Sequence, residues 1–186
     1  MKKFDLFLEK YNKDYISHLK MNEDLKKKFY KFFKFTLMVK KNKKKIIIFG
    51  NGGSASIASH FSVDMTKNGN VRCVNFNESN LLTCFSNDYG YENWVKEALK
   101  FYCDTQDLII LISSSGKSLN MINAAKFLKN KNNKLITFTG FGKKNKLSKL
   151  GDLNFVVNSK SYNLIENIHQ YWLLILVDIF SKNKIK

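Results

Sequence analysis

A short apolar run followed at once by a glycine turn constrains the fold of this chain more than any other feature. Residues 46–49 read Ile-Ile-Ile-Phe, which predicts a buried strand, and residues 50–54 read Gly-Asn-Gly-Gly-Ser. Three glycines in four positions predict a turn that side chains would not fit, and Ser54 begins a helical run. Because free backbone N–H groups and the helix dipole point the same way at such a junction, the sequence predicts an anion site there.

The same predicted helix carries two groups able to do chemistry. His60 and Asp64 are spaced i, i+4 and therefore share one face of the helix. They can move protons or hold a metal ion, and a plain ion pair on the helix surface is the alternative.

From residue 46 onward, predicted strands and helices alternate. The strands are expected at 46–49, 71–76, 107–113, 134–139 and 154–157, and the helices between them at 54–67, 91–102 and 118–130. Several strands are continuous apolar runs, as expected when helices cover both faces of a sheet. We therefore predict a three-layer α/β/α domain with a five-stranded, mostly parallel sheet, whose ligands lie beyond the carboxyl ends of the strands.

Helices are predicted at both ends of the chain. Apolar stripes predict helices over residues 4–20 and 24–40, with Asn22 as a cap between them, and a last helix over 161–182 that is apolar nearly all round. The length of 186 residues fits one domain. We expect a helical hairpin over 1–42, the α/β core over 43–160 and a terminal helix over 161–186 that packs in the core of an oligomer.

A second candidate phosphate loop follows the strand at 107–113. Residues 113–118 read Ser-Ser-Ser-Gly-Lys-Ser, so hydroxyls and backbone N–H groups can together hold phosphate oxygens. The Gly-Lys-Ser within it is not a nucleotide triphosphatase loop, because that motif needs a glycine where Leu111 stands. A serine-rich capping turn is the alternative.

Composition excludes several classes of protein. The net charge is +17, yet only one of 32 basic residues, Arg72, is an arginine, which favours a solvated lysine surface over a nucleic-acid groove. The charged N-terminus lacks the apolar core of a signal peptide, and no apolar run is long enough to span a membrane. Three cysteines without metal-like spacing favour reduced, buried thiols, so we expect a cytoplasmic protein without a membrane partner.

With both loops in place, the chain resembles the sugar isomerase (SIS) domain family, and within it the phosphoheptose isomerases. The resemblance covers nearly the whole chain. It rests on the two leading helices and, in order, on Gly50-Asn51-Gly52-Gly53-Ser54-Ala55, His60-Phe61, Asn87-Asp88-Tyr89-Gly90-Tyr91-Glu92, Ser113-Ser114-Ser115-Gly116-x-Ser118-x-Asn120, Thr139-Gly140, and the last helix with Glu166 and His169.

The resemblance implies an SIS fold of the flavodoxin-like kind, a homotetramer with sites between subunits, and an aldose–ketose isomerase acting through an enediol. The implied substrate is a heptose phosphate, sedoheptulose 7-phosphate converted to D-glycero-D-manno-heptose 7-phosphate, with no nucleotide cofactor. The implied substrate contacts are Asn51, Gly52, Gly53, Ser54, Asn87, Asp88, Ser113, Ser114, Ser115 and Ser118, with the serines on the phosphate.

The chain departs from the family where the resemblance implies catalysis. Asp64 stands where the family has a glutamate that is base and metal ligand, and Glu166 stands at a glutamine position. Leu174 stands where the family has a second histidine that is acid and zinc ligand. We take Asp64, Glu166 and His169 as catalytic candidates, and His60, Asp64 and Glu166 as ligands for zinc or another divalent metal.

Three interpretations stay open at this point. The chain is an active isomerase with a rearranged site, or it binds a sugar phosphate but acts on another substrate or supports a partner, or it is a non-catalytic assembly protein. Purely structural roles are the alternatives for two of the candidates. His169 is then a buried core histidine, and Glu166 is an acid favoured only by the helix dipole.

Overall fold

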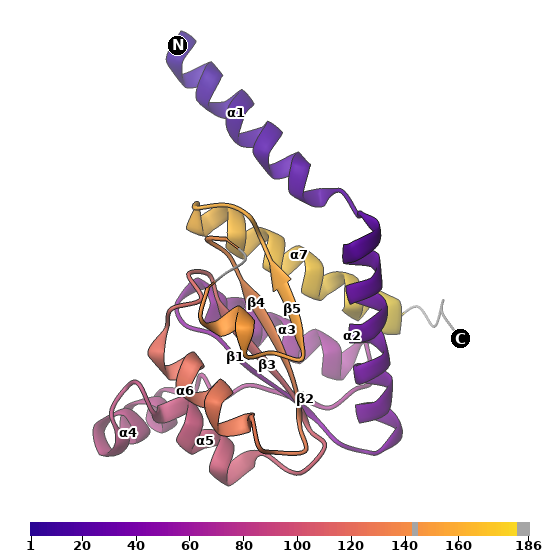
Figure 1. The fold of residues 1–186 in the computed structure, drawn as a ribbon, viewed down its shortest axis with the longest axis vertical. Coiled ribbons are helices and arrows are strands. Elements are labelled where there is room, and N and C mark those ends of the chain that lie inside the picture. The colour runs from indigo at the N-terminus through magenta and orange to yellow at the C-terminus, as the bar shows by residue number, and fades with distance from the viewer. Residues whose placement is uncertain (143–144, 182–186) are drawn as a thin grey trace.

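The protein folds into one parallel sheet with helices on both faces and a helical arm at its N-terminus, as a computed structural model shows for residues 1–142 and 145–181 (Figure 1). In chain order the elements are α1 (Lys2–Leu19), α2 (Glu23–Lys41), β1 (Ile46–Phe49), α3 (Gly53–Lys67), β2 (Cys73–Val74), α4 (Ser79–Tyr89), α5 (Trp94–Tyr102), β3 (Leu108–Ser113), α6 (Leu119–Leu128), β4 (Lys134–Thr139), the 3-10 helix η1 (Leu147–Lys149), β5 (Leu153–Val156) and α7 (Tyr162–Ser181).

The sheet has five strands in the order β2-β1-β3-β4-β5, and each of its neighbouring pairs is parallel. The three-layer α/β/α fold class is therefore confirmed. β2 is only two residues long rather than spanning 71–76, because pairing with β1 stops after Cys73 and Val74. β1 and β3 lie side by side in register, so the loops that follow them emerge next to each other.

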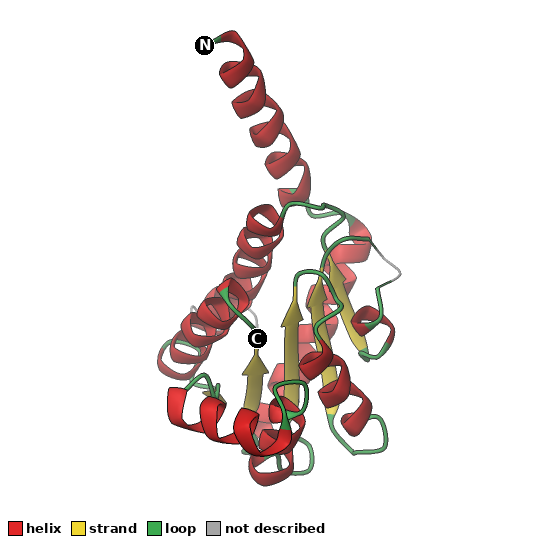
Figure 2. Ribbon diagram, turned by 90° about the vertical axis from the view of Figure 1, so that its left-hand side faces the viewer, coloured by secondary structure: helices red, strands yellow, loops and turns green. Residues whose placement is uncertain are grey.

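Alternation along the strands builds the two cores. Ile46 and Ile48 of β1 face the layer of α2, α3 and α7, whereas Ile47 and Phe49 face the layer of α5 and α6. Figure 2 shows the strands pointing the same way between these helical layers. Both faces of β1 and β3 are buried, which explains their continuous apolar sequences.

One helix, α4, is not among those predicted from the sequence. α4 begins after Glu78, whose carboxylate accepts hydrogen bonds from the backbone N–H groups of Asn80 and Leu81 at 3.0 and 2.9 Å. No residue of α4 is fully buried, but Leu81, Leu82 and Phe85 share one face and pack partly buried against the core, so the helix has only a short apolar stripe.

The N-terminal helices do not form the expected hairpin. Asn22 caps α2 as predicted, accepting from the backbone N–H of Leu25 at 2.9 Å. α1, however, projects away from the rest of the molecule and contains no buried residue (Figures 1 and 2). Its apolar stripe lies open, with Phe4 and Phe7 exposed at 63% and 62%. The single subunit leaves this part of the stripe uncovered, whereas Tyr15 and Leu19 near the other end of α1 pack against the core.

α7 packs along α3 and against the sheet. Nine of its residues are fully buried, whereas Leu174, Ile175 and Ile179 are only partly covered. Across residues 1–142 and 145–181, no helix combines the length and the apolar character that crossing a membrane requires.

Candidate functional site

The turn after β1 leads directly into α3, where the sequence predicts an anion site. Gly52 precedes α3 with a positive φ of 54°, a conformation that favours glycine, and both Gly52 and Gly53 are exposed. At Gly50 a Cβ would overlap the backbone carbonyl of Ser54, because the first turn of α3 folds back over it. The N–H groups of Ser54 and Ala55 donate to the Asn51 and Gly52 carbonyls at 3.0 and 2.9 Å, so the exposed glycines of the turn are its most accessible part for an anion.

The serine loop after β3 contains the second set of predicted phosphate contacts. The Ser113 and Ser118 hydroxyls lie 3.0 Å apart across the loop, and Ser115 Oγ accepts from the backbone N–H of Lys117 at 3.2 Å. Gly116 has a φ of 63°, and a side chain there would overlap Asn145. Since β1 and β3 are neighbours in the sheet, the two predicted loops lie at one edge.

A pair of amides joins the two loops directly. Asn51 Nδ2 donates to Asn120 Oδ1 at 3.1 Å, and Asn120 Nδ2 donates back to Asn51 Oδ1 at 2.9 Å. The Tyr91 hydroxyl donates to Asn51 Oδ1 at 3.2 Å, which adds the segment after α4 to the same cluster.

Glu166 reaches the glycine turn from α7. Its carboxylate occupies the space where a Cβ on Gly53 would lie, and Ser114 Oγ donates to Glu166 Oε1 at 3.4 Å. This negative charge lies at the N-terminus of α3, which the helix dipole favours. The structure thus brings Glu166 together with both predicted loops.

His60 and Asp64 lie farther along α3. His60 Nε2 is 3.1 Å from Asp64 Oδ2, and the Gln170 amide nitrogen is 3.1 Å from His60 Nδ1. An amide nitrogen only donates, so Nδ1 accepts from Gln170 and the ring proton is on Nε2, facing Asp64. At roughly 1.5 Å of rise per residue, Asp64 is about 16 Å along the helix from Gly53.

Leu174 is the neighbour of Asp64. The two residues line one hollow of about 370 Å³ between α3 and α7, with Asp178 one turn farther on. The position where the family resemblance implies a histidine therefore does lie beside the predicted base, and here it offers only a hydrocarbon side chain.

One subunit does not assemble the predicted metal centre. Within the described residues, no group of three or more His, Cys, Asp or Glu side chains is placed to hold a metal ion. Glu166 lies against Gly53 and Ser114, while the two ring nitrogens of His60 face Asp64 and Gln170. Zinc normally takes three or four protein ligands, so these residues as arranged do not fit it, and the metal set of His60, Asp64 and Glu166 stays a prediction.

His169 lies in the core rather than at either loop. Its side chain is fully buried beside Phe138 and Trp172, and Nε2 lies 3.1 Å from the backbone carbonyl of Thr139. Burial lowers its pKa to about 4, although the bond to Thr139 opposes the shift. At neutral pH it is an uncharged imidazole that supports β4, which is the alternative weighed against its catalytic role.

The predicted sugar contacts Asn87 and Asp88 lie near the end of α4. Asn87 Nδ2 donates to Asp88 Oδ1 at 2.9 Å, and Cys84 Sγ lies 3.7 Å from Asp88 Oδ2. Both Asn87 and Asp88 are exposed and available to a ligand or to another subunit.

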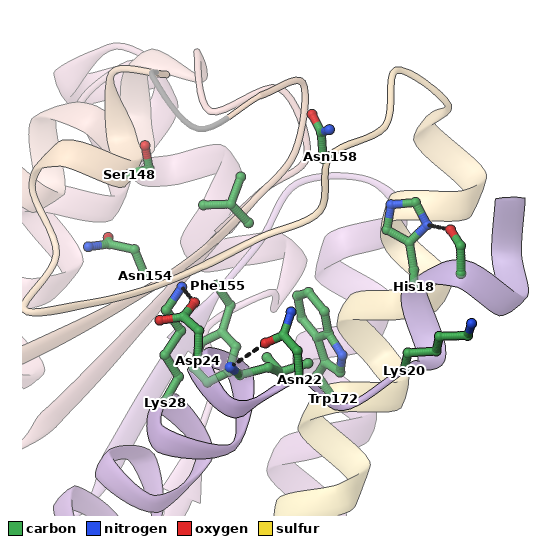
Figure 3. Close-up of a pocket in the computed structure, with 13 residues that line it drawn as sticks. His18, Lys20, Asn22, Asp24, Lys28, Ser148, Asn154, Phe155, Asn158 and Trp172 are labelled. Atoms are coloured by element: carbon green, nitrogen blue, oxygen red, sulfur yellow. Dashed lines mark hydrogen bonds and ion pairs between the residues drawn. The ribbon is translucent and has the colours of Figure 1, made fainter.

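A larger hollow of about 430 Å³ lies elsewhere, where α1 leads into α2 (Figure 3). His18, Lys20 and Asn22 line it from the segment that joins the two helices, together with Asn158 and Trp172. None of the predicted site residues lines it, so cavity size alone would point away from the two loops.

Three residues of the cluster were not predicted as site residues. Asn120 and Tyr91 belong only to the motifs that carry the family resemblance, and Gln170 belongs to none of them. Gln170 had a usable signal, because it follows Glu166 by four positions and therefore shares its face of α7. The partners of Asn120 and Tyr91 have no local signal.

Comparison with known proteins agrees with this geometry. A family model described as SIS domain matches residues 10–140. The curated phosphoheptose isomerase of Aliarcobacter butzleri is 32% identical over 167 residues, which cover 84% of this chain and 88% of that relative. The phosphoheptose isomerase of Buchnera aphidicola is 31% identical over 148 residues, 76% of each chain. The solved structure of a phosphoheptose isomerase from Francisella tularensis has the same fold, with a TM-score of 0.85 at 22% identity over 97% of both chains.

Proposed function

The chain belongs to the SIS domain family and, within it, to the phosphoheptose isomerases, and from this premise we propose that it is an aldose–ketose isomerase of phosphorylated sugars. The proposed reaction is the conversion of sedoheptulose 7-phosphate to D-glycero-D-manno-heptose 7-phosphate. The observation that carries it is the placement of two phosphate-type loops side by side with a carboxylate, Glu166, between them.

The charge of Glu166 favours one seat for the phosphate. A carboxylate at the start of α3 repels a phosphate dianion there, whereas the serine loop offers the Ser115 and Ser118 hydroxyls at the start of α6. We therefore place the phosphate on the serine loop and the sugar along the start of α3, with Asn51, Gly52, Gly53 and Ser54 beside it. Asn87 and Asp88 are the proposed contacts to sugar hydroxyls.

The reaction needs a base at carbon and proton transfer between two oxygens. In the proposed sequence a carboxylate takes a proton from C1 of the ketose while O2 gains one, giving the enediol. A proton then returns to C2 and the O1 proton leaves, giving the aldose. Asp64 is the proposed base, held by His60, and Glu166 is the carboxylate closest to the loops. His169 keeps only a supporting place, since its ring lies within the core.

We further propose a cytoplasmic homotetramer. The open apolar stripe of α1 and the partly covered Leu174, Ile175 and Ile179 of α7 support assembly through the two terminal helices. In this assembly we place the site between subunits, so that Asp64 of one subunit faces the glycine turn and serine loop of a neighbouring subunit.

The test is isomerisation in deuterated water. Incubation with sedoheptulose 7-phosphate, with and without zinc, is expected to give aldose product carrying deuterium at C2. Asp64→Asn is expected to reduce turnover at least about 100-fold while binding is kept, and Asp5→Asn on α1 is the matched control. Absence of both product and exchange at C1 or C2 would refute the proposal.

Leu174 favours a second candidate, a divergent SIS protein that binds a sugar phosphate without isomerising it. A leucine beside Asp64 neither donates a proton nor binds a metal. Sugar phosphate binding without deuterium exchange is the outcome that this candidate predicts.

A further inference from the structure

We propose that Asn120 and Tyr91 are positioning residues. They hold the glycine turn and the serine loop together, and they orient the Asn51 amide so that its Nδ2 group faces the substrate. The proposal rests on the proposed function, in which Asn51 contacts the sugar. It names two residues outside the set of predicted substrate contacts, one on α6 and one between α4 and α5.

The orientation of the cluster follows from one backbone group. The N–H of Met121 can only donate, and it lies 3.0 Å from Asn120 Oδ1, so this atom is an oxygen. Asn120 Nδ2 therefore faces Asn51, and the atom it reaches on Asn51 must be Oδ1. The reciprocal bond then runs from Asn51 Nδ2, and neither amide has freedom to flip.

Because Asn120 is buried, losing one of these hydrogen bonds is energetically costly. Its side chain is 1% exposed, so each lost partner leaves a polar atom without water. Asn51 follows β1 and Asn120 stands in the first turn of α6, after the serine loop, so their two bonds tie the glycine turn to the serine loop. The separation of the two loops is thereby set by side chains rather than by the sheet alone.

The hydrogen bonds already made by Asn51 and Tyr91 determine which of their atoms can donate to or accept from the substrate. Asn51 Oδ1 already accepts from Asn120 and from Tyr91, so Asn51 meets a ligand as a donor, through its second Nδ2 hydrogen. The Tyr91 hydroxyl donates its hydrogen bond to Asn51, so its oxygen can accept a hydrogen bond from a sugar hydroxyl. Tyr91 is 50% exposed and therefore accessible to a ligand.

Binding of inorganic phosphate, measured by calorimetry, tests the locking role without turnover. Asn120→Ala is expected to weaken phosphate binding about tenfold. Asn133→Ala is the matched control, because Asn133 donates to the Asp104 and Asp107 carbonyls at 2.8 and 3.0 Å, before β3 begins and therefore at the end of the strands opposite the loops. Equal effects of the two variants, or unchanged binding in Asn120→Ala, would overturn the locking role.

Tyr91→Phe tests the second role and keeps the proposal falsifiable if Asn120→Ala fails to fold. It is expected to raise KM for the sugar phosphate about fivefold, to change kcat less than twofold, and to leave inorganic phosphate binding unchanged. Tyr89→Phe, at a neighbouring tyrosine with 43% exposure, is the control. An unchanged KM in Tyr91→Phe would overturn the role of Tyr91. Phosphate binding that follows these expectations without any isomerisation would overturn the proposed function and leave the locking of the loops intact.

Discussion

Replacing His169 by glutamine is expected to remove a large part of the acid sensitivity of this fold. Burial lowers the pKa of His169 to about 4 from an ordinary value of 6.5, because the charged ring would lose its water. Nε2 donates to the Thr139 carbonyl, and Nδ1 is buried with no partner among the residues that the structure describes. A proton on Nδ1 would therefore be a charge without a hydrogen-bond acceptor.

The magnitude follows from linkage. Because the folded pKa lies below the unfolded one, the stabilisation is complete above about pH 6.5 and is lost as the pH falls through about 4. At about 1.36 kcal/mol per pKa unit the full loss is about 3 kcal/mol, and about 2 kcal/mol of it is already lost at pH 5.

The assay is urea unfolding of wild type and His169→Gln at pH 7 and pH 5, at equal protein concentration. Glutamine keeps a donor for the Thr139 carbonyl but does not titrate, and every other residue is the same in the two proteins. Wild type is expected to lose about 2 kcal/mol more than the variant between the two pH values. An equal loss of unfolding free energy in both proteins would refute the burial argument. It would mean that His169 can exchange protons with solvent in the folded protein.

The remaining predictions concern the loops, the arm and the metal. Gly50→Ala is expected to unfold the protein or lower its melting temperature by more than 5 °C, since the new Cβ overlaps the Ser54 carbonyl; a melt within 1 °C of wild type would contradict this. Ser118→Ala is expected to weaken phosphate binding by about 1 kcal/mol in calorimetry through loss of a hydroxyl from the serine loop, whereas unchanged affinity would move the phosphate elsewhere. Deletion of residues 2–19 is expected to leave a folded core, because α1 buries no residue, but to reduce the oligomer in sedimentation; an unaltered assembly would remove α1 from the interface. Leu174→His is expected to bind zinc at least tenfold more tightly than wild type, because it adds an imidazole beside Asp64, and equal affinities would mean that the α3–α7 face is not the metal site.

Local patterns predicted most of the architecture. Continuous apolar strands, glycine turns and helical stripes predicted the five strands, the parallel sheet and the position of both loops, because each depends on a few consecutive residues. α4 was missed because its apolar stripe is short: Leu81, Leu82 and Phe85 pack only partly buried against the core, and no residue of the helix is fully buried. The hairpin at residues 1–42 failed for a different reason: periodicity shows that α1 has an apolar face but not what covers it.

The candidate site divides in the same way. The sequence by itself determined the glycine turn, the serine loop and the His60–Asp64 pair, since spacing along one element fixes which groups share a face. Only the tertiary structure decided that Asn51 pairs with Asn120, that Glu166 lies against Gly53, and that the His169 ring enters the core. Those contacts join residues far apart in the chain, and their geometry is set by how α6 and α7 pack on the sheet rather than by any local preference.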